Sequence, residues 1–447
     1  MPTLANINFP TESALIELYE LHLSELGYLL YRHHNLMAMD EFSWCDQIEL
    51  EPRIAAHLDA LALGEELAFR CSEVLTRSGD EDELLGAVYS LATILNDDQR
   101  GRVALSAFSE ADDELLPVFV MALGHATHPS ISATLVQLLS HQRPTVSRAS
   151  AQILAFRQDV NPKSIWPYLH HVEPYVRDNA LSVYAAMGAT EIIPATEQLL
   201  FDSGKTVSDE NLCAMLKLGS PRAIELARSR CAKAQSTSAE LLMWLAMQGK
   251  LSDLNLIYTA ASFPEMGIPA LQALGVLGNV QVIPALIKVL QQNDDALKVV
   301  VADALQLMTG AKLKEQVTVP EEMIEELDPE DVANGEATEK IPSPRRVEIT
   351  RNSTHYQQWY EWWQQQGSRF DKNIRWRHGQ PFSVSGCIAE LAKPGSTLQT
   401  RLRAHQELLL SGNRIAFHPE WMVSRQREVI SRLPSCQDIK NEAIRVK

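Results

Sequence analysis

Histidines are the residues of this sequence whose type and grouping could bind a metal ion. The tightest groups among the 13 histidines are His33-His34, His125 with His128, and His170-His171. A helical metal site needs two imidazoles three or four residues apart, so that both lie on one face, together with a further ligand. Adjacent histidines point about 100° apart on a helix, and His125 and His128 straddle a glycine turn before a proline. We therefore expect imidazoles that face solvent or cap helices, with no metal and no cofactor.

Carboxylates are the second group that could do chemistry, as a general acid and base. They gather in short polar runs between apolar segments, as in residues 80–83 and 97–98, which is typical of solvated loops and helix starts. The sequence contains no Gly-x-Ser-x-Gly, no phosphate-binding Gly-x-x-x-x-Gly-Lys and no dinucleotide-binding Gly-x-Gly-x-x-Gly. We therefore expect no catalytic residues and a protein that is not an enzyme.

Charge and composition narrow the class of protein further. Residues 1–340 hold 23 Lys and Arg against 48 Asp and Glu, a net charge of −25, whereas residues 341–447 hold 17 against 9, a net of +8. An acidic body repels phosphate backbones, so we expect no nucleic-acid partner. The basic end can dock on that acidic body or meet a separate acidic surface.

The location of the protein is indicated by apolar segments and cysteines. No run approaches the roughly 20 apolar residues of a membrane helix, and the first residues lack the pattern of a signal peptide. Six scattered cysteines without a Cys-x-x-Cys pair are typical of buried thiols in a reducing compartment. We expect a cytoplasmic protein without membrane insertion.

The elements that must position these side chains are indicated by an internal repeat. Residues 180–200 and 270–290 align, with Gly188 and Gly278 each followed six residues later by the proline of an Ile-Pro pair. The recurring glycines lie at 188, 219, 249, 278 and 310, a period near 30 residues. Gly124 precedes the set, and residues 158–161 replace the glycine in one irregular unit.

Each repeat predicts two helices. The first helix ends at the glycine, which can adopt the left-handed conformation, and the second begins with proline in its first turn. Neither helix buries its apolar stripe alone, so the pairs must stack. With Val-Arg, Ala-Leu and Leu-Gly at matching offsets, the pattern resembles short HEAT-like repeats. The expected fold is all-α, an α-solenoid of HEAT-like helical pairs over residues 101–313.

The flanking regions have different compositions. Residues 1–100 show helical periodicity out of register with the repeats and predict an N-terminal helical cap. Residues 320–340 hold nine acids and one lysine, so residues 314–350 are expected to form an acidic, mobile linker. Residues 351–447 are expected to form a basic, aromatic C-terminal helical module, with a turn at 375–382 and helices at 384–392 and 398–410.

The binding surface of such an array is expected on its concave face, lined by second helices. Those helices are expected to bury residues such as Ile192, Leu199 and Leu286. Their outward positions are the candidate partner-binding residues: Gln137, His141, Glu197, Gln198, Glu225, Arg228, Lys288 and Gln292.

The aromatic run of the C-terminal module has two interpretations. Trp359, Trp362 and Trp363 share one helix, and we expect them to pack against the last repeat rather than to anchor a partner. Tyr360 and Trp376 remain as candidate partner contacts, because Tyr and Trp are frequent at interface hot spots. Arg375 and Arg377, which flank Trp376, are expected to pair internally with the acidic array.

Segments outside the repeats carry a further resemblance. Residues 28–32 (Tyr-Leu-Leu-Tyr-Arg), 51–61 (Glu-Pro-Arg-Ile-Ala-Ala-His-Leu-Asp-Ala-Leu) and 375–382 (Arg-Trp-Arg-His-Gly-Gln-Pro-Phe) occur in a particular order, before Arg401–Leu408. This order resembles an uncharacterised proteobacterial family of HEAT-like proteins, over nearly the whole chain. Its members tend to be encoded among type VI secretion genes, near PAAR-like tip proteins and effectors.

This resemblance implies a protein-protein interaction scaffold, an adaptor or chaperone for a type VI secretion tip (PAAR-like) or effector protein. The alternative is an immunity-type inhibitor that binds and blocks a cognate toxin. The resemblance supplies no catalytic residues.

Overall fold

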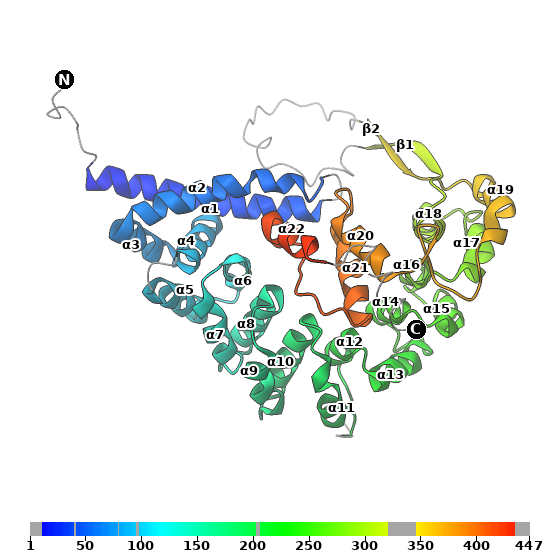
Figure 1. The fold of residues 1–447 in the computed structure, drawn as a ribbon, viewed down its shortest axis with the longest axis horizontal. Helices are drawn as coiled ribbons and strands as arrows, with labels where there is room; N and C mark the ends of the chain where they lie inside the picture. Colours follow the sequence, from blue (N-terminus) through cyan, green and yellow to red (C-terminus); the bar gives the residue numbers. More distant parts are fainter. Residues whose placement is uncertain are drawn as a thin grey trace, which may run out of the picture. The chain divides into compact units, whose positions relative to one another are not determined.

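The computed structural model describes residues 11–39, 42–78, 80–94, 98–202, 206–320 and 346–433. The chain divides into two compact units, with residues 1–224 and 383–447 in unit 1 and residues 225–382 in unit 2. The described residues are mostly α-helical, from α1 to α22, with four short strands. The predicted all-α character is therefore confirmed, apart from these strands (Figure 1).

Unit 1 contains the first helices of the chain. In order they are α1 (Glu12–Ala38), η2 (Asp46–Glu49), α2 (Glu51–Leu63), α3 (Glu65–Leu75), α4 (Glu81–Thr93), α5 (Asp98–Glu110), α6 (Leu116–His125), α7 (Pro129–Leu138), α8 (Pro144–Arg157), α9 (Pro162–Ile165), η3 (Trp166–His170), α10 (Pro174–Ala186), η4 (Thr190–Ile192), α11 (Ile193–Phe201) and α12 (Asp209–Lys217). Helix α13 (Pro221–Cys231) begins in unit 1 and ends in unit 2. Unit 1 is completed by α20 (Val384–Ala392), α21 (Leu398–Leu410) and α22 (Val423–Ser431).

The packing of unit 1 follows the predicted alternation of first and second helices. Helices α4, α6, α8, α10 and α12 each pack against the next, and their apolar positions, such as Leu154 and Val183, are fully buried. Helices α5, α7, α9 and α11 lie on the side of this layer away from α20 and α21 (Figure 1). We call them the second-helix layer of unit 1. The layer of first helices begins at α4, inside the region expected to be a separate cap.

The crossing of α1 and α4 depends on two glycines. A Cβ atom at Gly86 would lie 1.9 Å from the carbonyl oxygen of Leu23, and a Cβ atom at Gly27 would lie 1.9 Å from that of Asp82. The two backbones therefore touch at this crossing, which any side chain would force apart. This contact fixes the N-terminal helices against the first-helix layer.

Unit 2 repeats the same pattern. Its elements are α14 (Ala239–Gln248), η5 (Leu251–Asp253), α15 (Leu254–Ala260), α16 (Gly267–Leu277), η6 (Val280–Val282), α17 (Ile283–Val289), α18 (Asp295–Thr309), β1 (Lys314–Pro320), β2 (Arg346–Asn352), α19 (Tyr356–Gln366), η9 (Gly367–Arg369), β3 (Trp376–Arg377) and β4 (Gln380–Pro381). Helix α14 packs on α16, and α16 packs on α18, with α15 and α17 beside them.

The predicted helix ends are confirmed. Gly188, Gly219, Gly249, Gly278 and Gly310 all have positive φ, between 61° and 76°. In the irregular repeat Gln158 takes the left-handed conformation instead, with φ 53°. Gly124 differs, because it lies inside α6 and the cap residue Ala126 is extended. Pro194 and Pro284 lie in the first turn of α11 and α17, as expected.

The region expected to be a linker is partly β-structure. Strands β1 and β2 pair antiparallel, with Val317 opposite Ile349, and Arg351 donates to Glu315 at 2.8 Å. The alternating β-branched residues favour a strand. The sequence interpretation missed this signal because the neighbouring residues are strongly acidic. The stretch 321–345 lies outside the described residues, so the expected mobility of that part stays a prediction.

The expected C-terminal module is divided between the two units. Residues 351–382 belong to unit 2 and residues 383–433 to unit 1. The predicted turn at 375–382 is confirmed as a β3–β4 hairpin, whose central residues His378 and Gly379 have φ of 50° and 74°, as a type I′ turn requires. Helices α20 and α21 match their predicted ranges.

Candidate protein-binding surface

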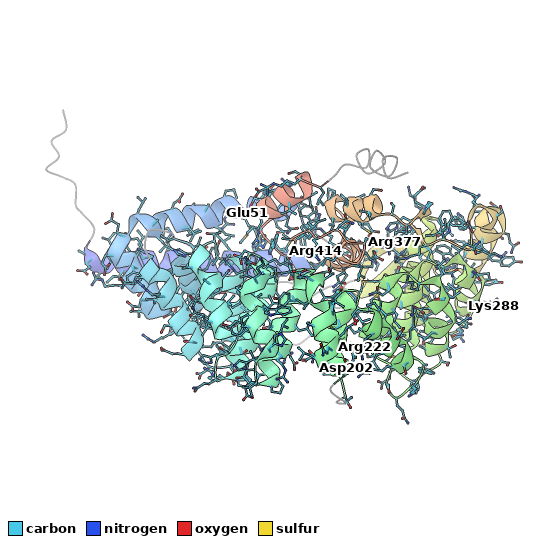
Figure 2. The ribbon with its side chains drawn as sticks, turned by 60° about the horizontal axis from the view of Figure 1, so that its bottom comes forward. Glu51, Asp202, Arg222, Lys288, Arg377 and Arg414 are labelled. Carbon is cyan, nitrogen blue, oxygen red and sulfur yellow. The ribbon has the colours of Figure 1, made fainter. Side chains whose placement is uncertain are left out.

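Five of the eight residues expected on the outward side of the second helices are exposed. In unit 1, Gln137 of α7 and Gln198 of α11 are exposed. In unit 2, Glu225, Lys288 and Gln292 are exposed, and Lys288 is labelled in Figure 2. These side chains are available to a partner on each unit.

The other three expected residues form contacts within their own unit. Glu197 accepts a hydrogen bond from Ser220 Oγ at 2.5 Å and one from the backbone N–H of Arg222 at 3.3 Å. His141 accepts the backbone N–H of Arg143 at 3.2 Å through Nδ1. Arg228 forms two bonds to Asp253, at 2.8 and 2.9 Å. These residues tie a second helix to its neighbours, a structural role that the sequence interpretation missed.

Replacing Arg228 by glutamine should lower the free energy of unfolding by about 2 kcal/mol. The reason is that Asp253 is buried, so its carboxylate would lose its bidentate partner without reaching water. Urea denaturation of the full chain measures the change. The control Glu225→Gln alters an exposed neighbour on the same helix and should change stability by less than about 0.5 kcal/mol. Equal losses in the two variants would contradict a structural role for Arg228.

Large apolar side chains are exposed beside the second-helix layer of unit 1. Trp166 of η3 is 40% exposed, Val172 in the following loop 81%, and Leu199 of α11 40%. We call these three residues the apolar anchors. The expectation that Leu199 is buried was therefore wrong. Ile192 and Leu286 are fully buried, as expected.

The aromatic run lies on α19, which packs against α17 in unit 2. Trp359 is 1% exposed, and its indole N–H donates to the Ser353 carbonyl at 2.6 Å. Trp362 and Trp363 are half-buried. Burial of this face against the last helical pair is therefore confirmed for Trp359. Tyr360 is exposed and stacks on Tyr356 with ring centroids 5.7 Å apart.

Trp376 is not available to a partner in this structure. Only 9% of it is exposed, and its ring packs at 4.6 Å against that of Phe370. Its indole N–H donates to the Asp371 carbonyl, and its backbone N–H donates to Gly278 at 2.8 Å. The candidate assignment of Trp376 as an interface residue is corrected to a core position of unit 2.

The arginines beside Trp376 bind a helix end. Arg375 donates to the carbonyls of Leu277 and Val276 at 3.2 and 3.0 Å, at the C-terminal end of α16. Its guanidinium also lies 3.9 Å from the centre of the Phe382 ring. A helix C-terminus carries partial negative charge and free carbonyls, so it is a favourable docking site for a basic segment.

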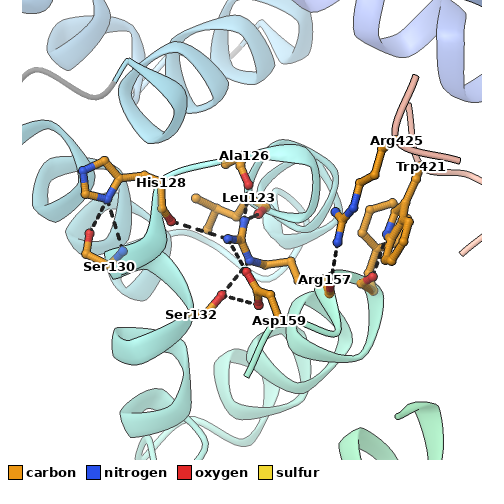
Figure 3. A network of polar contacts seen from close by, with 10 residues as sticks. Leu123, Ala126, His128, Ser130, Ser132, Arg157, Asp159, Trp421 and Arg425 are labelled. Atoms are coloured by element: carbon orange, nitrogen blue, oxygen red, sulfur yellow. Dashed lines mark hydrogen bonds and ion pairs between the residues drawn. The ribbon is translucent and has the colours of Figure 1, made fainter. Parts of the chain in front are cut away.

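The C-terminal segment of unit 1 makes the same kind of contact with α8. The indole N–H of Trp421 donates to the Phe156 carbonyl at 2.8 Å, and Arg425 donates to the Arg157 carbonyl at 2.8 Å. Arg425 also lies 3.4 Å over the Trp421 ring. Figure 3 shows both side chains reaching the end of α8.

The Arg157 side chain is the centre of a network of hydrogen bonds next to these contacts (Figure 3). The side chain is buried and donates to the carbonyls of Leu123 and Ala126, at the end of α6, the first at 3.0 Å. It also donates to Ser132 Oγ at 2.7 Å and pairs with Asp159 at 2.7 Å. One guanidinium therefore caps α6 and links α7 to α8.

A line of ring contacts crosses unit 1. The ring centroid of His33 on α1 lies 6.0 Å from that of His125 on α6, His125 lies 4.9 Å from Phe156 on α8, and Phe156 lies 4.6 Å from His418. We call His33, His125, Phe156 and His418 the imidazole row. The expectation of solvent-facing or capping imidazoles is wrong for His33, which is 1% exposed, and confirmed for His128, which caps α7.

Burial controls the charge of these rings. It lowers the pKa of His33 to about 4, with a smaller contribution from His34. It also lowers the pKa of His418 to about 3, with His405, Arg425 and His34 adding to the effect. The pKa of His125 lies well below its usual value for the same reason. All three rings are therefore neutral at pH 7.

In the described part of the chain, no group of three or more His, Cys, Asp or Glu side chains is placed to hold a metal ion. Likewise, none of the helices described here combines the length and apolar character needed to cross a membrane.

Comparisons with known proteins assign no family. No protein-family model matches the chain, and no curated protein matches it. Two engineered proteins solved by the Northeast Structural Genomics Consortium are similar to it. One is 15% identical, with 92% of this chain and 100% of that chain covered and a TM-score of 0.24. The other is 17% identical, covering 64% and 95%, with a TM-score of 0.16. TM-scores this low carry no argument about fold or function.

Proposed function

We propose that the protein is a non-enzymatic scaffold that binds a protein partner through the second-helix layer of unit 1. The observation that carries this proposal is the exposure of Trp166, Val172 and Leu199 beside that layer. Tryptophan is enriched among interface hot spots, and burying large exposed apolar side chains favours association. The exposed Gln137 and Gln198 supply hydrogen-bonding groups on the same layer.

The proposed architecture is an α-solenoid of HEAT-like pairs. It is supported by left-handed residues that end successive first helices, and by first helices that each pack against the next within a unit. In such an array each pair contacts its neighbours, and the free faces form an extended surface for a protein partner. Because the second helices of unit 1 lie away from α20 and α21 (Figure 1), we place the binding surface there rather than on a face lined by the first helices.

The partner that we propose to test first is a PAAR-like secretion tip protein or an effector, with the chain acting as its cytoplasmic adaptor or chaperone. The order of sequence segments that resembles the secretion-associated family supports this choice. The exposed surface itself supports only a protein partner with a complementary apolar patch.

Binding of the full chain to each purified candidate tests the proposal. Substituting the apolar anchors together, as Trp166→Ala, Val172→Ser and Leu199→Gln, should weaken the Kd at least about 30-fold, because one lost hot spot costs about 2 kcal/mol. The matched control replaces three exposed apolar residues of α1–α3, Leu18→Gln, Leu63→Ser and Val74→Ser, and should leave the Kd unchanged.

Two results would count against the adaptor. Absence of binding at both low and moderate salt to every tip and effector protein encoded nearby would remove the proposed partner, and equal weakening by both triple variants would remove the proposed surface. Rescue of cells that express a toxin, without any loss of secretion when the gene is deleted, would favour the immunity-type inhibitor instead.

A further inference from the structure

The segment 413–433 is bound to several helices of unit 1 that are distant in sequence. Val423 packs with Met37 and Trp44, with Ile430 beside them. Phe417 exchanges two backbone hydrogen bonds with the Gln158 side chain, both 3.1 Å long. The backbone N–H of Ser424 donates to Glu51 at 3.1 Å. The contacts of this segment therefore reach α1, η2, α2 and α8.

The imidazole row lies at this docking contact. His418 belongs to the segment, whereas His33, His125 and Phe156 belong to the helices that receive it. His33 is buried, and its Nε2 atom has no hydrogen-bond partner. A proton added to that atom would therefore place a positive charge where no acceptor meets it.

The charged groups around the row are mostly basic. His34 and Arg425 face the rings of His125 and His418, and His405 faces His418. Glu420 is the carboxylate beside them, 3.6 Å from both His34 and His418. Farther out, Arg425 faces Asp159, Arg157 and Glu428, and Arg157 already holds Asp159. A single adjacent carboxylate does not balance three new imidazolium charges beside Arg425.

We propose that the imidazole row is an acid-sensitive latch. As neutral rings it holds the segment 413–433 on α1, α6 and α8, and protonation of the rings releases the segment. Release uncovers the carbonyl ends of α8 and the apolar contact of Met37 and Trp44 with Val423. Acid would thus change the surface of unit 1 without unfolding its helices.

The direction of the pH dependence follows from linkage. The docked rings have lowered pKa values, about 4 for His33 and about 3 for His418, whereas released rings return to about 6.5. The released state therefore binds more protons, so docking is strongest above pH 6.5 and weakens as the pH falls below it. Each ring that release exposes to water contributes a factor of up to about ten per pH unit between its docked and its released pKa.

Hydrogen–deuterium exchange of the full chain between pH 7.5 and pH 5 tests the latch, with rates corrected for the intrinsic pH dependence of exchange. The protection of peptides from 413–433 should fall at least about 10-fold between pH 6.5 and 5 and return on neutralisation. Peptides from α16 and α18 of unit 2 serve as the internal reference and should keep their protection. Ordinary carboxylates stay ionised in this range. Protection of 413–433 that does not change with pH would overturn the proposal.

Variants test whether the imidazole row, rather than other titrating groups, causes the pH dependence of protection. The triple variant His33→Phe, His125→Phe and His418→Phe should lose the pH dependence, and His418→Phe alone should lower its slope by about one proton. The control His22→Gln removes an imidazole of unit 1 that pairs with His57 at 3.0 Å, outside the row, and should keep the full slope. If the triple variant does not fold, the single variant decides: an unchanged slope in His418→Phe would overturn the latch.

Discussion

Replacing Arg157 by methionine is expected to lower the free energy of unfolding by about 3–5 kcal/mol. The guanidinium is 3% exposed and donates to carbonyls at the end of α6 that no other side chain shown in Figure 3 reaches. Methionine fills much of the volume but leaves those carbonyls without the guanidinium donor and removes the ion pair with Asp159. Urea denaturation followed by circular dichroism measures the loss.

The control for this variant is Arg148→Met on the same helix. Arg148 is exposed and lies 3.4 Å from the exposed Glu210, so its loss should change stability by less than about 0.5 kcal/mol. If Arg148→Met were as destabilising as Arg157→Met, helix propensity or net charge would explain both, and the buried network would not.

Replacing Gly86 by valine is expected to lower the free energy of unfolding by more than about 3 kcal/mol. Its Cβ atom would lie 1.9 Å from the Leu23 carbonyl oxygen, and backbone cannot move aside as a side-chain end can. Helices α1 and α4 would have to separate along their crossing, which also loosens the buried contacts of Leu26. Thermal denaturation of the full chain compares the variants.

Gly101→Ala is the matched control, because Gly101 is also a helical glycine, in α5. Its Cβ atom would meet nothing closer than 3.4 Å, at Ser130 Oγ. Alanine should therefore stabilise the helix by about 0.5–1 kcal/mol. A Gly86→Val variant as stable as the parent would show that the two backbones do not touch in solution.

The sequence predicted those structural elements that are marked by single residues, such as the ends and starts of helices. Gly219 and Gly278 mark helix ends because few residues other than glycine adopt positive φ without strain, and Pro194 marks a helix start. The β1–β2 pair was missed because its alternation, carried by residues such as Val317 and Ile349, adjoins a longer acidic run. The local sequence signals therefore predicted the helical pairs but did not predict the β1–β2 pair.

Contacts between segments that are distant along the chain could not be predicted from the sequence. Nothing near Phe417 indicates that it meets Gln158, and the spacing of His33 and His125 gives no sign that their rings approach each other. The basic charge of the C-terminal region left internal docking and a separate acidic surface equally open. It did not indicate that Arg375 and Arg425 bind the carbonyls of helix ends.

The division of the chain has a consequence for its synthesis. Unit 2 is inserted between the two parts of unit 1, so a ribosome delivers all of residues 225–382 before the segment that completes the first 224 residues. Until Trp421 and Arg425 emerge, the last carbonyls of α8 remain hydrated and Trp44 lacks its partner Val423. The part of the protein that is translated first is thus the part that matures last. A nascent chain whose residue 382 has just left the ribosome would present chaperones with a complete unit 2 and an incomplete unit 1.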